Sequence, residues 1–289
     1  MSEQLDLEEV TAILLEEHHS HYENSIPPKA LHKILYFAAK EFEREHVEVQ
    51  LPLYWYIYGA VVRTTGTGVS IIEKPVGQRI ACETRVADIT AGERTIQRAR
   101  RALARSLHKY YDLGLEGMTD EMYREAPYAV QRVYRKLDKQ LGVAADDQQT
   151  TLFGHRNVER TRETVYEFVE TFPVDAFAEY ENDLHIWYRL VSAELDSEEY
   201  DPDRVQRVSE LFWRLFCIEL ACRENNRVSR SAIASELNVQ SVEALKQELR
   251  GELLNREREK ARRNAQDTTE AVNAAEAFVL PHLDFDTTA

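Results

Sequence analysis

The chain has 289 residues, of which 43% are hydrophobic, and 36 basic against 51 acidic residues give it a formal net charge of -15. This apolar fraction is sufficient for a packed core and argues against a disordered chain, and the length allows two ordinary domains or one large one. A net charge this negative provides no overall field that attracts phosphate, so nucleic acid is not the expected partner.

The choice of basic residue is skewed, because the 36 basic residues divide into 9 Lys and 27 Arg. Acidic surfaces with Arg in place of Lys are typical of a halophile that keeps molar salt in its cytoplasm. Screening over about 3 Å at 1 M salt would remove the self-repulsion of such a chain. An ordinary acidic protein is the alternative, but acidity alone does not explain the scarcity of Lys.

The cysteines and the N-terminal segment predict a cytoplasmic protein. Cys82, Cys217 and Cys222 form no C-x-x-C pair, and they lie in apolar runs typical of reduced core thiols. The first residues, MSEQLDLEEV, are polar and acidic, unlike a signal peptide. No window approaches the apolar length of a membrane span, so no membrane association is expected.

The first half of the chain reads as helices interrupted by a small β element. Hydrophobic periodicity predicts helices over 5–23, 28–46, 91–111 and 119–141, the last two capped by Thr90 and Thr119. Between the second and third helices, the aromatic run 54–59 favours a strand, and the short β-favouring runs 69–72 and 79–82 predict a hairpin.

The second half reads as helical throughout. Residues 143–154 are polar and aperiodic and form the candidate linker. The helices expected after it cover 157–171, 181–195, 203–224, 230–237 and 240–262. The predicted fold class is therefore mainly α: a helical N-terminal domain with a β insert near 53–82, and an all-helical C-terminal domain. The predicted domain bounds are 1–142, a linker at 143–154, 155–263, and a mobile tail at 264–289.

Candidate catalytic and metal sites each have a simpler structural explanation. His18 and His21 share a helix face with Glu17 nearby, a spacing that could hold zinc or iron. The segment lacks H-E-x-x-H, and a solvated helix C-terminus itself favours His. The Gly/Thr-rich run 64–68 lacks the frame and the Lys of a phosphate loop, so it is expected to be a turn. We therefore predict no enzyme activity, no catalytic residues, no metal and no cofactor.

A basic stripe is the first candidate contact surface. Arg94, Arg98, Arg101 and Arg105 recur at steps of four, three and four, and so share one helix face. Residues 93–140 hold 11 basic against 7 acidic residues, a local excess of basic charge in an acidic chain. This face could bind an acidic partner or a nucleic-acid backbone. The alternative, which we favour, is that the row pairs internally with the acidic first helix or packs its stems over the domain surface.

A helix-turn-helix pattern lies at 230–250, with Ala234 at the helix crossing and Asn238 in the turn. The second helix would read DNA through Gln240, Ser241, Lys246 and Arg250. Two acidic residues on that helix oppose its two cations, a poor balance for a phosphate-lined groove. A DNA-binding transcriptional regulator is therefore the alternative function, behind a plain helical packing unit.

Two motifs in the first half resemble the Panacea (SocA-like) family. Leu31-His32-Lys33-Ile34-Leu35-Tyr36-Phe37-Ala38 is similar to its K-L-L-Y-[FY]-A helix, and the run from Trp55 to Val62 is similar to its W-x-Y-G-P-V-V segment. Tyr123-x-x-Ala126-Pro127-Tyr128 is placed like a later landmark of the family. The resemblance covers about residues 5–140, with Ala60 in place of the Pro and a hairpin-like insert after the second motif.

The resemblance implies a compact helical binding domain without catalysis, used in many cases as an antitoxin and in one branch as a proteolytic adaptor. The expected function is therefore a non-enzymatic regulatory protein that binds a partner protein, and the antitoxin members of the family imply a toxin as that partner. Partner contacts are expected at the Arg row and at the aromatics Tyr54, Tyr56 and Tyr58. The motif residues expected in the core are Leu31, Lys33, Leu35, Tyr36, Phe37, Ala38, Trp55, Tyr58, Gly59 and Val61.

Overall fold

The computed structural model describes residues 4–75, 77–146, 151–198 and 200–279. That part of the chain is mainly helical with two small antiparallel hairpins, which confirms the predicted fold class. The elements in chain order are α1 (Leu7–His21), α2 (Pro28–Arg44), β1 (Leu53–Tyr56), β2 (Gly59–Val62), β3 (Val69–Lys74), β4 (Gly77–Cys82), α3 (Glu93–Tyr110), α4 (Gly114–Arg124), α5 (Ala129–Asp146), α6 (Thr151–Thr171), α7 (Glu181–Leu195), α8 (Pro202–Arg223), α9 (Arg230–Glu236) and α10 (Val242–Val279).

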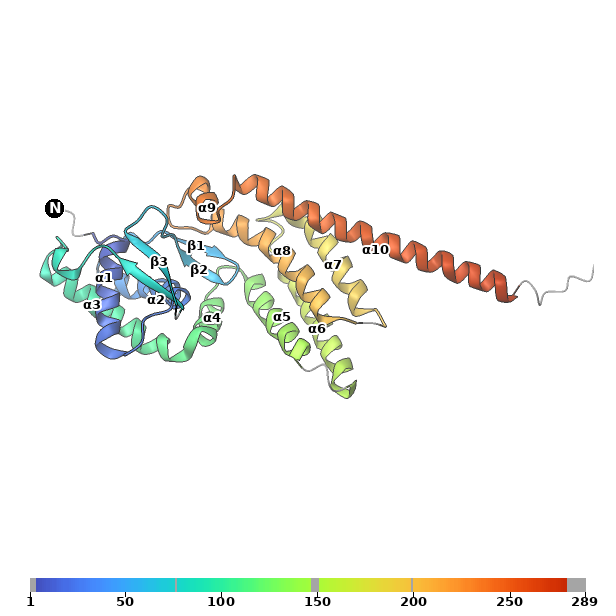
Figure 1. Ribbon diagram of the computed structural model, residues 1–289, viewed down its shortest axis with the longest axis horizontal. Coiled ribbons are helices and arrows are strands. Elements are labelled where there is room, and N and C mark those ends of the chain that lie inside the picture. The colour runs from blue at the N-terminus through green and yellow to red at the C-terminus, as the bar shows by residue number, and fades with distance from the viewer. Residues whose placement is uncertain (1–3, 76, 147–150, 199, 280–289) are drawn as a thin grey trace, which may run out of the picture.

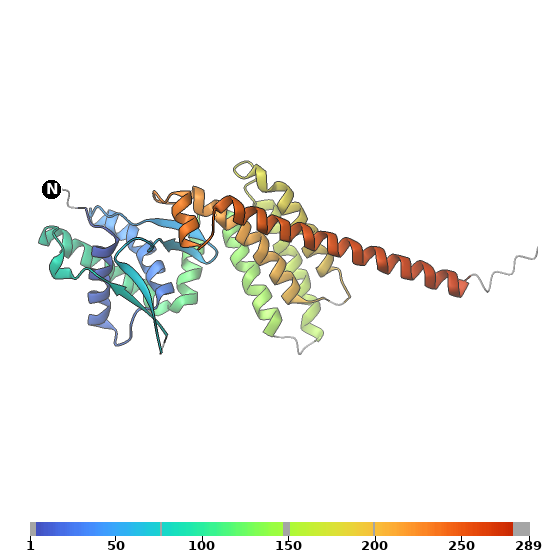
Figure 2. The same cartoon turned by 45° about the horizontal axis from the view of Figure 1, so that its top comes forward.

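These elements form two groups that lie side by side (Figure 1). One group contains α1, α2, α3 and the two hairpins, and the other is a bundle of α5, α6, α7 and α8. α10 packs along α7 and α8 and then projects past the end of the bundle, as the turned view in Figure 2 also shows. The β1–β2 hairpin and α4 lie where the two groups meet.

The first two helices begin at clear sequence signals. The Asp6 carboxylate accepts a hydrogen bond from the Glu9 amide at 3.0 Å, and the Glu9 carboxylate accepts one from the Asp6 amide at 3.1 Å, which together form a capping box. Pro28 occupies the first turn of α2, where its missing N–H costs no hydrogen bond. α2 buries the stripe that its periodicity predicts, which is Leu31, Ile34, Leu35, Ala38 and Phe42, and it buries Ala30 and Phe37 as well.

Both β elements are tight two-residue hairpins. β1 pairs with β2 so that Tyr56 lies opposite Gly59, and β3 pairs with β4 so that Lys74 lies opposite Gly77. The strand-favouring aromatic run and the hairpin at 69–82 are therefore confirmed. They form two separate sheets.

The predicted single helix over 119–141 is wrong. α4 ends at Arg124 and α5 begins at Ala129, because Pro127 has no amide proton and restricts the residue before it. Neither predicted threonine cap exists. Gly92 is the N-cap of α3, and Thr119 lies inside α4, where its hydroxyl donates to the Leu115 carbonyl at 2.7 Å.

Aromatic side chains fill the core of the bundle. Trp187 stacks on Phe212 with ring centroids 5.6 Å apart, and Trp213 stacks on Tyr134 at 3.9 Å. Phe168, Phe172, Phe177, Tyr180 and Phe216 complete the cluster. Such rings bury large apolar areas and rank among the strongest contributors to core stability.

The predicted linker and tail are more helical than expected. Residues 143–146 belong to α5 and 151–154 to α6, while 147–150 lie outside the described residues. The final helix does not end at 262 but continues to Val279, so 264–279 are helical, and 280–289 lie outside the described residues.

Hydrogen bonds join the two groups of elements at β1. The Asn226 amide donates to the Leu53 carbonyl at 2.7 Å, and the Trp55 amide donates to the Glu224 carbonyl at 3.2 Å. Tyr128 donates its hydroxyl proton to the Glu224 carboxylate at 2.8 Å. The division of the chain near 143–154 stays a prediction, and these contacts cross it.

Candidate functional site

The tip of the β1–β2 hairpin is fixed by side chains from three helices. The Ile57 carbonyl accepts hydrogen bonds from the Tyr123 hydroxyl at 2.6 Å and the Trp213 indole at 3.1 Å. The Tyr58 carbonyl accepts one from the Lys33 ammonium at 2.9 Å. α2, α4 and α8 each supply one of these donors, so the tip has a single well-defined position relative to the body.

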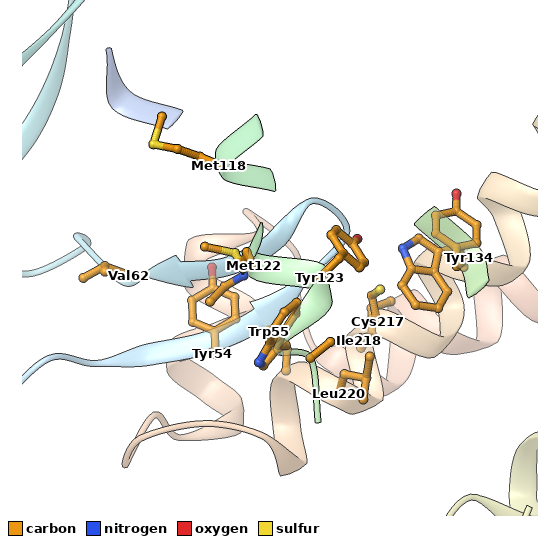
Figure 3. Close-up of a cluster of buried hydrophobic side chains, with 14 of the residues drawn as sticks. Tyr54, Trp55, Val62, Met118, Met122, Tyr123, Tyr134, Cys217, Ile218 and Leu220 are labelled. Atoms are coloured by element: carbon orange, nitrogen blue, oxygen red, sulfur yellow. The ribbon is translucent and has the colours of Figure 1, made fainter. Parts of the chain in front are cut away.

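Gly59 allows the tip to lie close to α4. Its φ of +106° is a conformation that L-residues rarely adopt, and a Cβ built there would lie 2.3 Å from the Met122 sulfur. The Ala60 amide points at the same sulfur from 3.0 Å. Figure 3 shows Met122 against the strands that carry Tyr54 and Trp55. The glycine of the W-Y-I-Y-G run is therefore required by packing as well as by backbone geometry.

Tyr58 lies on this fixed tip and is 67% exposed, the largest fraction among the large hydrophobic side chains described. A cavity of about 400 Å³ opens beside it. The Lys29 ammonium lies 5.8 Å from the centre of the Tyr58 ring, in the range of a cation–π contact. The lining residues come from α2, the β1–β2 hairpin, α4 and α5: Lys29, His32, Lys33, Tyr58, Ala60, Val61, Leu115, Glu116, Thr119 and Arg135.

The cavity combines apolar walls with cations. Burial, together with the charges of Arg135 and Lys29, lowers the pKa of Lys33 to about 8. Burial also lowers the pKa of His32 to about 4, and its Nδ1 accepts a hydrogen bond from the Val62 amide at 3.3 Å. At neutral pH His32 is therefore uncharged, while Lys33 is mostly charged.

The predicted aromatic contacts separate into one exposed and two covered side chains. Tyr58 is exposed, but Tyr54 is only 2% exposed and Tyr56 is half-buried, so the expectation of exposure is wrong for both of these. Tyr54 and Trp55 face opposite sides of β1 and are both buried, so the folded chain covers both faces of this strand. Tyr58 is the one exposed member of the predicted motif core. The other members are buried or half-buried: Leu31, Lys33, Leu35, Tyr36, Phe37, Ala38, Trp55, Gly59 and Val61.

The Arg row is partly used within the chain. Arg101 pairs with Glu45 at 2.9 Å, and Arg105 pairs with Glu45 and, at 3.2 Å, with Glu41. Internal pairing therefore occurs for these two residues, but its partners lie at the end of α2 and not, as we had expected, on the first helix. Arg94 and Arg98 are exposed and make no ion pair with any residue that the structure describes.

The histidines of α1 are engaged in packing. His18 is buried, and its ring centre lies 4.8 Å from those of both Tyr22 and Tyr111. The His21 Nδ1 lies 2.9 Å from the Glu17 carbonyl. Within the described ranges, no three His, Cys, Asp or Glu side chains are grouped so that they could hold a metal ion.

The Gly/Thr-rich run 64–68 is a turn, as predicted, and its amides bind carboxylates of the chain itself. The Thr64 and Thr65 amides donate to Glu236 at 3.3 and 3.1 Å. The Gly68 amide donates to Glu8 at 2.6 Å. These carboxylates connect the turn to α9 and to α1.

α9 and α10 are joined by a short turn in which Asn238 has φ +52°, at the position predicted for the turn residue. The two predicted DNA-reading cations are occupied inside the protein. Lys246 is buried against the Glu219 carboxylate, and Arg250 donates to Asp183 at 2.7 Å. Ser241 caps α10 by accepting from the Ala244 amide at 3.1 Å, while Gln240 is exposed.

Sequence reasoning missed most residues of the Tyr58 cavity. Arg135 and Leu115 lie on later helices that the folded chain brings to the hairpin tip. One signal was available at Lys33, a charged residue in an otherwise apolar helix stripe, because a buried Lys needs a polar partner.

Comparison with known proteins adds no relative: no family model, no curated protein and no solved structure matches the chain. The described helices include none that is long and apolar enough to cross a membrane. The resemblance to the Panacea family therefore stays a prediction, and the site must be interpreted from its own geometry.

Proposed function

We propose that this protein is a non-enzymatic regulatory protein that binds a partner protein through Tyr58 and the cavity beside it. The observation that carries the proposal is a tyrosine 67% exposed on a hairpin tip whose two turn carbonyls accept three side-chain hydrogen bonds. An antitoxin-like or adaptor-like role is the form of regulation that the resemblance to the Panacea family implies. The acidic, Arg-rich composition supports a halophile cytoplasm as its setting.

A fixed, exposed tyrosine is suited to partner binding for two physical reasons. Its ring supplies a large amphipathic contact area, and Tyr is enriched among residues that dominate binding energy. Because the tip is already held by Lys33, Tyr123 and Trp213, little conformational entropy remains to be lost on binding. Leu115, which lines the cavity, is also exposed, and it extends the apolar area along the start of α4.

The geometry supports DNA binding less well. A helix that enters the major groove needs cations directed at phosphates and base edges. Lys246 and Arg250, the two cations available on the predicted reading segment, pair with carboxylates of α8 and α7. Releasing Arg250 would leave the buried Asp183 carboxylate without its ion-pair partner, and releasing Lys246 would leave the buried Glu219 carboxylate with Arg223 alone, which opposes such use.

The test is a comparison of three baits in lysate of the native host at molar KCl. Immobilised wild type, Tyr58→Ala and Tyr166→Ala are compared by quantitative mass spectrometry. Tyr166 is 49% exposed on α6 and is the matched control. We expect a specific protein that wild type and Tyr166→Ala retain and Tyr58→Ala loses. If every retained protein is indifferent to Tyr58→Ala, the proposed function is wrong.

A further inference from the structure

Lys33 carries a buried positive charge with no ion-pair partner among the residues that the structure describes. Its side chain is 5% exposed, and its ammonium donates to the Tyr58 carbonyl at 2.9 Å. Among the described residues no carboxylate lies within ion-pair distance of it. An ammonium has three donors, and buried ammonium groups in proteins are normally paired with an anion. Lys246, the other buried lysine described, has such a partner in Glu219.

The walls of the cavity indicate which group a ligand would need in addition to an anion. Ala60, Val61, Leu115 and the Tyr58 ring provide apolar surface. Lys29, Lys33 and Arg135 line the same cavity as a single carboxylate, that of Glu116. Arg135 pairs with Asp120 and Asp138, each at 2.9 Å, so Lys29 and Lys33 are the two lining cations without an ion pair to any described residue. The cavity is therefore cationic and apolar at once, in a chain whose net charge is -15. A ligand that complements it has a carboxylate next to an apolar group.

We propose that this cavity binds the C-terminal residue of a partner chain, with its α-carboxylate at Lys33 and its apolar side chain against Leu115 and Val61. This inference rests on the proposed function and names the part of the partner that is recognised. An Asp or Glu side chain would satisfy Lys33 but bring no apolar group. An apolar C-terminal residue carries both groups on one Cα, within reach of a cavity of about 400 Å³.

Binding of a carboxylate has a consequence for Lys33 itself. Burial and the neighbouring cations lower its pKa to about 8 in the free protein. A bound carboxylate stabilises the charged form, so the pKa of Lys33 rises when the site is filled. Above pH 8, binding is then accompanied by proton uptake at Lys33, and the affinity for the carboxylate falls as the pH rises further.

The test uses the full chain in molar KCl with lysine Cε labelled for NMR. The probes are acetyl-Ala-Ala-Leu as the free acid, the same peptide as the C-terminal amide, acetyl-Ala-Leu-Asp-amide, and hexanoate. We expect the free acid to shift the Lys33 signal saturably and to raise its pKa. The amide should bind about ten-fold more weakly or worse, as loss of a hydrogen bond to a charged group predicts.

Two variants of the cavity are used, so that the test does not depend on either one of them folding. Lys33→Gln retains a donor for the Tyr58 carbonyl but no charge, and should remove the preference for the acid. Should it fail to fold, Leu115→Asp places a like charge on the 41% exposed wall and should weaken acid binding. Leu113→Asp is its control, since Leu113 is 47% exposed and does not line the cavity.

Each remaining outcome contradicts the proposal in a different way. Equal binding of acid and amide, or no binding by any peptide, overturns it. Equal binding of the Asp-amide peptide would assign the site to an internal acidic side chain, and equal binding of hexanoate to a small carboxylic acid. If Tyr58→Ala loses the partner while acid and amide bind alike, this inference fails and the proposed function stands. If Tyr58→Ala retains every partner, the proposed function fails whatever the peptides do.

Discussion

Replacing Gly59 by Ala tests whether the hairpin tip is held as tightly as the geometry indicates. Gly59 has φ +106°, and an added Cβ would lie 2.3 Å from the sulfur of the fully buried Met122. Gly77, at the corresponding position of the β3–β4 hairpin, has φ +110° but no atom within 4 Å of an added Cβ. The two glycines therefore share a backbone conformation and differ in packing, which makes Gly77→Ala the matched control.

The expected magnitudes follow from these two contributions. A side chain forced into a sparsely populated backbone region costs about 1–3 kcal/mol, and both variants pay this cost. Overpacking a core by one methyl group costs about 1–3 kcal/mol more, and only Gly59→Ala pays it. The gain from a less flexible unfolded chain is common to both and cancels. Gly59→Ala should therefore be less stable than Gly77→Ala by about 1–3 kcal/mol.

Urea unfolding in molar KCl, followed by tryptophan fluorescence, measures the difference directly. Trp213 donates to the carbonyl of the tip residue Ile57, so its fluorescence reports on the same contact. We expect a lower midpoint for Gly59→Ala than for Gly77→Ala with similar slopes. Equal midpoints would show that α4 yields freely to the added methyl group, and the rigid-tip argument would then be wrong.

Other predictions concern the ion pairs. Lys246→Met should destabilise the protein by about 1.5–3 kcal/mol, because it removes a charged hydrogen bond to the buried Glu219 carboxylate and leaves Arg223, at 2.6 Å, as the remaining ion-pair partner of that carboxylate; thermal unfolding of Lys246→Met against wild type checks this, and an unchanged midpoint would refute it. Hydrogen bonds from Arg105, then Arg101, lower the pKa of Glu45. Stability from this carboxylate is thus present above its unfolded pKa and lost as pH falls through the lower folded value. Carboxyl NMR titration should show that Arg105→Gln raises this pKa while Arg94→Gln does not; no rise would mean that the pair contributes nothing.

Hydrophobic periodicity predicted the helices that pack one face against the core, because that packing is what places apolar residues at a helical spacing. It failed where a helix is not packed in this way or where the helix is interrupted. α2 and α8 each bury at least one apolar stripe, and their predicted bounds agree with the structure within two residues. The last part of α10 projects past the bundle, and the sequence there lacks the apolar stripe that predicts a helix, so 264–279 were expected to be a tail. The break between α4 and α5 was readable in Pro127, which periodicity alone ignored.

The candidate site was only partly predictable, because its contacts join residues far apart in the chain. The motif residues Lys33 and Tyr58 were identified, but nothing local indicates that the ammonium of one reaches the carbonyl of the other. Likewise, the partners of Lys246 and Arg250 lie on earlier helices, so helix-turn-helix spacing could not show that both cations are already paired. A sequence pattern identifies a helix or a strand, whereas the pairing of charged side chains depends on how the helices and strands pack together.

The affinity of the purified partner for Tyr58 variants tests the central claim most directly. Calorimetric titration in molar KCl would compare wild type, Tyr58→Ala and Tyr166→Ala. For an anchor worth about 2 kcal/mol, Tyr58→Ala raises Kd by roughly 30-fold, and Tyr166→Ala leaves it unchanged within error. Equal Kd values for all three proteins would contradict partner binding at the Tyr58 surface.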